Sequence, residues 1–313
     1  MSRFKRIQYH RYGGPETMRL EDFRLPAPSD DEVAVQTKFA ALNPIDWKLR
    51  AGQMKMITGR VVPRGMGMDF AGVVTAVGAG VTRFKVGDAV FGLARFKQTG
   101  ALAQAVITKE RFLAHKPARL AFDDAACLGT PGVTAWNGLI DKAKLQPGQH
   151  VFINGCAGAV GEAAVQIARL HGATVSGTCS ARDMKRMRSL GMQHVYDYRA
   201  TALSSLAARF DVVYDTAASM RVAEGVALLR QGGSYLDLNP GPGKFIRAVF
   251  DRRLKPIICM PRPEILEKLA GAALENRFKL PIGETVALSD AIGLISELEQ
   301  GRKLGGKGVV AME

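Results

Sequence analysis

Short alternating runs of apolar and polar residues dominate the first part of the chain. Residues 31–43, 69–78 and 85–92 show such runs, broken by Gly, Pro and Asp, and this pattern predicts strands. From about residue 120 the pattern changes, and short apolar runs alternate with segments whose apolar positions have helical spacing. Such alternation is typical of a parallel sheet covered by helices on both faces. The pattern therefore predicts an α/β chain whose first part is rich in strands.

The second part of the chain divides into strands and helices of ordinary length. We expect helices over 160–171, 181–191, 220–233 and 263–277, and a helix over 289–301 that begins with Ser289 as its N-cap. We expect strands over 150–154, 173–178, 194–198, 210–217, 234–239, 255–261, 284–288 and 308–312. The last segments do not resemble a further strand–helix unit, so we expect them to return to the first domain. The predicted domains are residues 1–119 with 264–313, and residues 120–263.

Composition narrows the classes of protein that fit this pattern. The chain has 313 residues, 47% of them hydrophobic, and no apolar run approaches the ~20 residues of a membrane span. The N-terminal residues lack the apolar stretch of a signal peptide. We therefore expect a soluble, cytoplasmic protein without a membrane partner. The four cysteines are widely separated, which argues against both a disulfide framework and a structural zinc site.

The net charge of +14 favours anionic ligands. The basic residues are scattered, and no nucleic-acid motif with interleaved aromatic residues is present. A small anionic cofactor accounts for the charge more simply than a nucleic-acid partner does, so we expect no nucleic acid.

A glycine-rich turn stands between a predicted strand and a predicted helix. In "HVFINGCAGAVGEAAVQIARLHG", residues 150–172, the glycines are Gly155, Gly158 and Gly161. In a dinucleotide-binding turn, Gly158 would let the backbone approach a pyrophosphate and Gly161 would let the helix pack against the sheet. The unpaired N–H groups of the helix N-terminus, beside Ala159 and Val160, would face the negative charge. The first glycine of the G-x-G-x-x-G pattern is replaced by Cys156, and a tight turn without a ligand is the alternative.

The end of the next strand bears on the choice of cofactor. An NAD site usually has Asp or Glu about 20 residues after the glycines, and this chain has Ser180 there, followed by Arg182. Both side chains can donate hydrogen bonds to a 2′-phosphate, which favours NADPH. Asp183 could intrude on that site. In the alternative interpretation, Ser180 caps the following helix and Arg182 is solvated.

With these motifs, the chain resembles the medium-chain dehydrogenase/reductase superfamily, specifically its zinc-independent quinone oxidoreductase type. The resemblance runs nearly end to end, through "ALNPIDWKLRAG", "GMDFAGVVTAVGAGVTRFKVGDAVFG", "AACLGTPGVTAWNGL", "NGCAGAVGEAAVQIARLHGA" and "GGKGVV". It implies a β-rich GroES-like catalytic domain and a doubly wound parallel-sheet (Rossmann) cofactor domain. It also implies a homodimer, in which residues 255–261 are either an edge strand at the dimer axis or an internal sixth strand.

The resemblance also bears on metals. At the positions that correspond to zinc ligands in related alcohol dehydrogenases, this chain has Asn43 and the segment Gly67, Met68, Asp69. Zinc sites of that kind use thiolate and imidazole ligands, and neither is present at these positions, so we expect no metal.

The resemblance places further residues at the site. Asn43 and Asp46 are implied to lie near the nicotinamide and the substrate, although an Asx-Pro turn with Asp46 as a helix cap explains them equally well. Thr134, Tyr198 and Asn239 are implied to contact the cofactor, and Lys307 and Arg302 are candidates for a phosphate contact.

The function that these features predict is hydride transfer from NADPH, without zinc, to a small molecule. The acceptor would be a quinone or the β-carbon of an α,β-unsaturated carbonyl, because conjugation spreads the added charge that zinc would otherwise stabilise. An enoyl-thioester or alkenal reductase is one alternative, and a non-catalytic NADPH-binding protein is another.

Overall fold

A computed structural model describes residues 3–239 and 241–312 of the chain, which form two compact units. Unit 1 comprises residues 3–130 and 261–312, and unit 2 comprises residues 131–239 and 241–260. The first boundary therefore lies about ten residues later than the expected position after 119, because the helix α3 (Phe122–Cys127) belongs with unit 1. The C-terminal segment groups with unit 1.

Unit 1 is built around a seven-stranded sheet in the order β15-β16-β3-β5-β6-β8, with β7 paired to β3. Its strands are β3 (Glu32–Ala41), β5 (Asp69–Val77), β6 (Ala89–Leu93), β7 (Ala105–Lys109), β8 (Leu113–His115), β15 (Ile282–Ala287) and β16 (Lys307–Ala311). A second sheet, in the order β2-β1-β4, contains β1 (Arg3–Tyr9), β2 (Met18–Arg24) and β4 (Arg64–Gly65). The helices are α1 (Pro44–Arg50), α2 (Lys55–Thr58), α3, α9 (Pro263–Leu274) and α10 (Ala291–Glu299).

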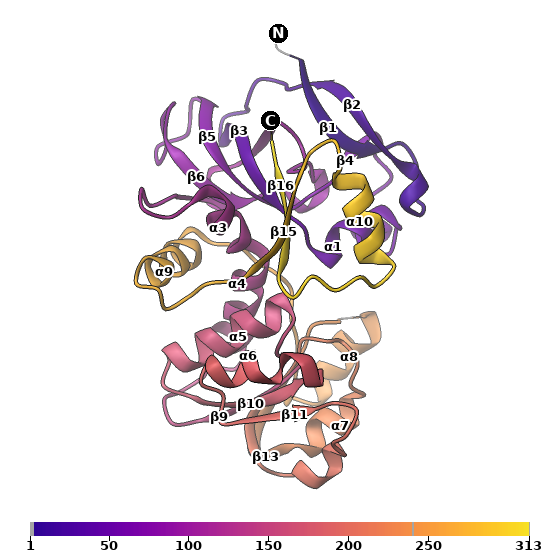
Figure 1. Cartoon of the computed structure of the whole chain (residues 1–313), viewed down its shortest axis with the longest axis vertical. Coiled ribbons are helices and arrows are strands. Elements are labelled where there is room, and N and C mark those ends of the chain that lie inside the picture. The colour runs from indigo at the N-terminus through magenta and orange to yellow at the C-terminus, as the bar shows by residue number, and fades with distance from the viewer. Residues whose placement is uncertain (1–2, 240, 313) are drawn as a thin grey trace. The chain divides into compact units, whose positions relative to one another are not determined.

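Two distant parts of the sequence complete the larger sheet of unit 1. The late strand β16 pairs antiparallel with the early strand β3, with Val309 opposite Ala41. In Figure 1 the yellow C-terminal segment accordingly lies beside the indigo and purple N-terminal strands. Apolar side chains from both segments form one core, including Val35, Phe70, Leu294 and Val310.

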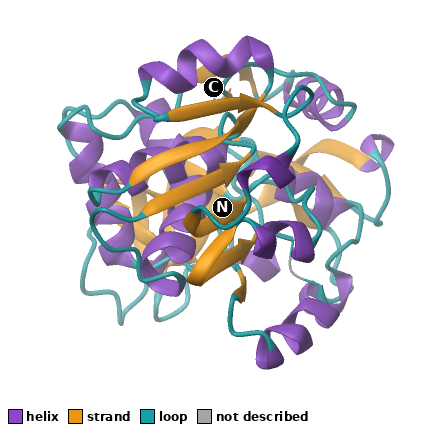
Figure 2. Ribbon diagram, turned by 90° about the horizontal axis from the view of Figure 1, so that it is seen from below, coloured by secondary structure: helices purple, strands orange, loops and turns teal. Residues whose placement is uncertain are grey.

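Unit 2 contains a six-stranded parallel sheet in the order β11-β10-β9-β12-β13-β14. Its strands are β9 (His150–Asn154), β10 (Thr174–Cys179), β11 (His194–Asp197), β12 (Phe210–Asp215), β13 (Leu229–Asp237) and β14 (Leu254–Pro256). The helices are α4 (Gly129–Trp136), α5 (Ala159–Leu170), α6 (Met184–Ser189), α7 (Val222–Ala227) and α8 (Pro242–Phe250). Helix α4 begins in unit 1 and continues as a π-helical segment over Asn137–Lys142. Helices flank the strands on both sides in Figure 2. The predicted doubly wound fold is confirmed.

Several local predictions require correction. The helix expected over 220–233 ends at Ala227, and Leu229 already begins β13, where it pairs with Phe210 of the neighbouring strand. The N-cap of α10 is Asp290 rather than Ser289. The segment 255–261 supplies the sixth strand, which is a short strand at the edge of the sheet.

Candidate functional site

In unit 1, the predicted residues Asn43 and Asp46 form the N-terminus of α1. Asn43 is the N-cap and Pro44 occupies the first helical position, where its missing N–H costs nothing. Asp46 Oδ2 accepts a hydrogen bond of 2.8 Å from the backbone N–H of Asn43, as in a capping box. Both side chains are buried. The helix-cap interpretation of Asp46 thus agrees with the geometry.

The side-chain amide of Asn43 is fully engaged within unit 1. Its Nδ2 donates to Asp69 Oδ2 at 2.9 Å and to Ala41 O at 3.2 Å. Its Oδ1 accepts a hydrogen bond of 2.6 Å from Lys307 Nζ. An amide has two donor hydrogens and one acceptor oxygen, so this side chain acts within a network instead of facing outward.

Asp69 joins this network to the beginning of α4. Its Oδ1 accepts hydrogen bonds from Thr130 N at 2.8 Å and from Thr130 Oγ1 at 2.6 Å. The approach is so close that a Cβ on Gly129 would lie 2.7 Å from the same oxygen. The sequence therefore needs glycine immediately before Thr130.

Burial sets the protonation of this cluster. Burial raises the pKa of Asp46 to about 7, although the hydrogen bond from the Asn43 backbone opposes the rise. Burial likewise raises the pKa of Asp69, and the Lys307 ammonium lowers it. The pKa of the Cys127 thiol rises to about 12, again because of burial, so this group stays protonated at neutral pH. Asp46 Oδ1 is buried and has no hydrogen-bond partner among the described residues.

Replacing Asp46 with Asn is expected to flatten the pH dependence of stability. The folded protein binds a proton on Asp46 that the unfolded chain, with an ordinary pKa of 3.8, has already released. This stabilisation is fully present below pH 3.8 and is lost as the pH rises through about 7. Denaturant unfolding of both proteins between about pH 4 and pH 8 measures the difference. Parallel curves for the wild type and Asp46→Asn would contradict the assignment.

In unit 2, the glycine-rich turn connects β9 to α5. Gly155 has a φ of +79°, a conformation that glycine adopts without strain. Gly161 packs so tightly that an added Cβ would lie 2.2 Å from Gly155 O. A Cβ on Gly158, the N-cap of α5, would meet only Gly155 O, at 3.5 Å. The turn thus combines one closely packed glycine with one that borders open space at a helix N-terminus.

Ser180 and Tyr198 come together at the ends of neighbouring strands. The backbone N–H of Tyr198, which follows β11, donates to Cys179 O at 3.2 Å, immediately before Ser180. The side chain of Ser180, the residue after β10, donates to Asp183 Oδ2 at 2.6 Å. Arg182 Nε lies 3.4 Å from the same carboxylate, and 59% of the Arg182 side chain is exposed. The carboxylate that the sequence flagged as intruding is therefore next to both predicted phosphate ligands.

The other predicted cofactor residues occupy different places in unit 2. Thr134 is buried in α4, where its carbonyl accepts a hydrogen bond of 3.0 Å from Tyr214 Oη. Asn239 is exposed just after β13, at the carboxyl end of the sheet. Ala159 and Val160 begin α5. The glycine turn, Ser180 and Asn239 thus lie near the edge where doubly wound sheets bind ligands, whereas Thr134 comes from a helix.

Sequence reasoning missed two contributors to these clusters and assigned a different role to a third. Thr130 is adjacent in sequence to Gly129 but carries no motif signal of its own. Arg186 forms an ion pair with Glu162 of α5, and its Nη2 donates to Ala157 O at 3.3 Å, which ties α6 to the glycine turn. Lys307 was expected to contact phosphate but is buried, and Arg302 pairs with Glu284 and Glu297.

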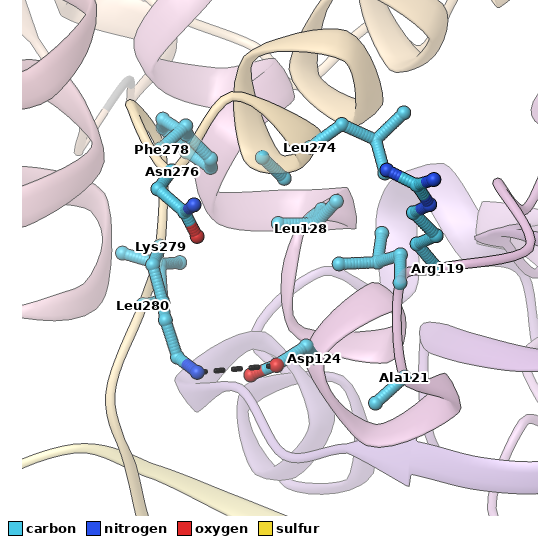
Figure 3. Close-up of a pocket in the computed structure, with 11 residues that line it drawn as sticks. Arg119, Ala121, Asp124, Leu128, Leu274, Asn276, Phe278, Lys279 and Leu280 are labelled. Carbon is cyan, nitrogen blue, oxygen red and sulfur yellow. Dashed lines mark hydrogen bonds and ion pairs between the residues drawn. The ribbon is translucent and has the colours of Figure 1, made fainter.

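A pocket of about 470 Å³ lies elsewhere in unit 1, between α3 and the end of α9 (Figure 3). Its lining combines apolar side chains with Arg119 and with Lys279, whose Nζ lies 3.2 Å from Asp124 Oδ2. None of the predicted site residues lines it. The cluster around Asn43 and the glycine turn therefore remain the candidate sites.

The described residues offer little to a metal ion. Among them, no group of three or more His, Cys, Asp or Glu side chains could hold one. Around Asn43 the potential ligands are an amide oxygen already bound to an ammonium, the Asp69 carboxylate already bound to Thr130 and Asn43, the buried Asp46 carboxylate and the protonated Cys127 thiol, with no imidazole. This set does not fit zinc, which is bound through thiolate, imidazole and free carboxylate groups.

Comparison with known proteins relates the chain to a large group of oxidoreductases. Residues 29–118 match the family model of the alcohol dehydrogenase GroES-like domain, and residues 159–236 match that of the zinc-binding dehydrogenases. The chain is 30% identical to the chloroplast envelope quinone oxidoreductase homologue of Arabidopsis thaliana, over 91% of this chain and 92% of that protein. It is 34% identical to the chloroplastic NADPH-dependent alkenal/one oxidoreductase of the same plant, over 74% of this chain and 61% of that protein.

A solved structure agrees with these relationships over the full length. The quinone oxidoreductase from Coxiella burnetii superposes with a TM-score of 0.91 at 28% identity, covering 100% of both chains.

Proposed function

Because the chain belongs to the medium-chain dehydrogenase/reductase superfamily, among its quinone oxidoreductases, we propose that it is a zinc-independent reductase that transfers a hydride from NADPH to a conjugated carbonyl acceptor. The observation that carries this proposal is the turn before α5. There, Gly161 packs against the backbone, whereas a Cβ on Gly158 would meet only Gly155 O, and Gly158 is the N-cap of α5, whose first N–H groups have no partner within the helix. That arrangement suits a pyrophosphate.

The proposed preference for NADPH rests on the end of β10. Arg182 is exposed two residues after Ser180, and Arg186 donates a hydrogen bond to Ala157 O in the glycine turn. The chain has no acidic residue at the position of Ser180, where NAD sites carry one. The negative charge of Asp183 opposes the preference for NADPH. To bind a 2′-phosphate, Ser180 and Arg182 must release the Asp183 carboxylate and contact the phosphate instead. One relative, the Arabidopsis alkenal/one oxidoreductase, is named as NADPH-dependent.

Zinc independence rests on the cluster around Asn43. An ammonium already donates to Asn43, and Cys127 is a neutral thiol at neutral pH. When bound, the reduced nicotinamide supplies the hydride. The residues of unit 1 fix the backbone from Asn43 to Asp46 at the start of α1, which supplies a rigid surface for the reacting groups. A quinone or an enone suits such a site because its conjugation disperses the added charge.

The acceptor class is the finer part of the proposal. Relatives named as quinone oxidoreductases favour a quinone, and the relative named as an alkenal/one oxidoreductase favours an enone or alkenal. An enoyl thioester remains a third acceptor class to test. We also propose a homodimer, since β14 is an open edge of the sheet in unit 2. A cytoplasmic location stays a prediction, because both plant relatives are named as chloroplast proteins.

The lengths and compositions of the helices bear on whether the chain could span a membrane. Among the described residues, none of the helices combines the length and apolar character needed to cross a bilayer.

The proposal predicts rapid oxidation of NADPH by one acceptor class and slow oxidation of NADH. The chelator-treated protein is mixed with either nicotinamide and with 1,4-benzoquinone, 9,10-phenanthrenequinone, an enone, an alkenal or an enoyl thioester, and loss of nicotinamide absorbance is followed. Turnover that survives the chelator supports a zinc-independent reductase and identifies its acceptor. Binding of NADPH without turnover on any acceptor would instead support a non-catalytic NADPH-binding protein.

A variant tests the cofactor assignment within the same assay. Arg182→Ala should raise the KM for NADPH about tenfold and leave that for NADH nearly unchanged, because only NADPH carries the 2′-phosphate. Arg188→Ala is the matched control, since this arginine is in the last turn of α6. Equal effects of Arg182→Ala on both nicotinamides would count against phosphate recognition by Arg182.

A further inference from the structure

Lys307 is a buried lysine whose ammonium is held inside unit 1. Only 4% of the residue is exposed, and its Nζ donates to Leu42 O and to Asn43 Oδ1, both at 2.6 Å. Lysine is almost never fully buried unless it is paired. The fold creates this position because β16, which begins at Lys307, runs antiparallel to the end of β3 just before Asn43.

The surroundings of Lys307 carry more negative than positive charge when ionised. Asp46 and Asp69 are both buried, and Lys307 lowers the pKa of each. It acts on the Cys127 thiol in the same direction. The ammonium thus provides a compensating positive charge to the two buried carboxylates, whereas the Cys127 thiol stays neutral at neutral pH.

The hydrogen bonds extend the influence of Lys307 to two helices. By donating to Asn43 Oδ1, Lys307 fixes which end of the amide faces Asp69, because Nδ2 must then donate to that carboxylate. Asp69 in turn accepts from the backbone and hydroxyl of Thr130 in α4. One ammonium therefore sets the amide at the start of α1 and, through Asp69, the contact with α4.

We propose that Lys307 is a positioning residue for the reductase reaction, a tethered cation that holds Asn43 and Asp69 in their working orientation. The expected effect on kcat rests on the proposed function, because it presupposes that the protein is a reductase. Its structural content, a buried ammonium held by the oxygens of Leu42 and Asn43, is independent of which acceptor is reduced.

Truncation of the side chain with chemical rescue tests this assignment. Lys307→Ala should lower kcat about 100-fold, the scale of loss for a misplacement of about 1 Å, while KM for the acceptor changes little. Methylammonium should bind in the vacated cavity, raise the melting temperature of the variant saturably and restore at least part of kcat. Tetramethylammonium, which has no N–H donor, should do neither, and the wild type should respond to neither cation.

The controls separate this proposal from its alternatives. Lys109→Ala removes an ammonium that pairs with Asp31 at 2.5 Å on the surface of unit 1, and it should neither lower kcat nor respond to methylammonium. A folded Lys307→Ala with wild-type kcat would overturn the proposal. So would a variant that Zn²⁺ restores and methylammonium does not, since that result indicates a metal position.

Two further results cover a variant that does not fold and a protein that is not a reductase. If Lys307→Ala does not fold, the double variant Lys307→Met with Asp69→Asn removes both charges together. It should fold, show a low kcat and not respond to methylammonium, and a wild-type kcat would refute positioning by Lys307.

If the wild type reduces no acceptor, the proposed function fails. The saturable rise in the melting temperature of Lys307→Ala with methylammonium then still decides whether the vacated space binds an ammonium.

Discussion

Gly161→Ala is expected to destabilise unit 2 by about 3 kcal/mol, the upper range for forcing extra atoms into a packed site. The added Cβ would lie 2.2 Å from Gly155 O and 2.8 Å from Cys156 Cα. Both neighbours are backbone atoms, so neither can rotate away, and α5 must move off the glycine turn. Guanidinium unfolding measures the loss, and NADPH binding should weaken with it if the N-terminus of α5 binds the pyrophosphate as proposed.

Gly158→Ala is the matched control, three residues earlier in the same turn. Its Cβ would meet only one atom, at the ordinary contact distance of 3.5 Å. Stability should change by no more than about 1 kcal/mol, as for an N-cap glycine replaced by alanine. The affinity for NADPH should nevertheless fall, because the methyl group stands where the backbone would approach a pyrophosphate. A Gly158→Ala protein that binds NADPH like the wild type would show that this turn does not hold the cofactor.

Asp69→Ala is expected to cost unit 1 about 3 kcal/mol, because removing the carboxylate leaves buried hydrogen-bond donors unsatisfied. The change removes the acceptor of two hydrogen bonds from Thr130 and one from Asn43. It also leaves the Lys307 ammonium buried with less compensating charge. Chemical denaturation at neutral pH measures the loss of unfolding free energy.

The conservative variant Asp69→Asn isolates the charge. Its amide oxygen can still accept hydrogen bonds from Thr130, so it should lose clearly less stability than Asp69→Ala. The nitrogen of the new side-chain amide at position 69 cannot accept the hydrogen bond from Asn43 Nδ2, so part of the loss of stability should remain. Identical unfolding curves for Asp69→Ala and the wild type would mean that the cluster contributes nothing to the stability of unit 1.

The sequence predicted the features whose cause is local. The alternation of strands and helices marked the parallel sheet, and the glycine spacing marked the turn before α5, because a tight strand–helix turn constrains adjacent residues. Element ends were less accurate where local preference and pairing disagree. Leu229 follows an apolar helical pattern, yet its pairing with Phe210 makes it part of a strand.

The cluster around Asn43 could not be read from local patterns. Lys307 lies 264 positions from Asn43, and only the antiparallel pairing of β16 with β3 brings them into contact. The family resemblance implied that Asn43 lies near the nicotinamide and that both Asn43 and Asp69 stand at positions of absent zinc ligands, but it gave no sign of their hydrogen-bond partners. The bond between Ser180 and Asp183 was equally undetermined, because sequence does not say whether a serine hydroxyl turns toward its own helix or toward a ligand.

The division of the chain has a consequence for its synthesis. Unit 2 is one continuous segment, so it can fold as soon as residue 260 has left the ribosome, whereas unit 1 needs segments from both sides of it. Until β16 has been made, residues 39–41 at the end of β3 lack their neighbour, although β7 already pairs with residues 32–36 on the same edge, and the nascent protein carries an open strand end next to an incomplete apolar core. Nascent chains halted between about residue 260 and β16 should therefore aggregate more readily than completed ones, and chaperones should bind them over the purple strands of Figure 1.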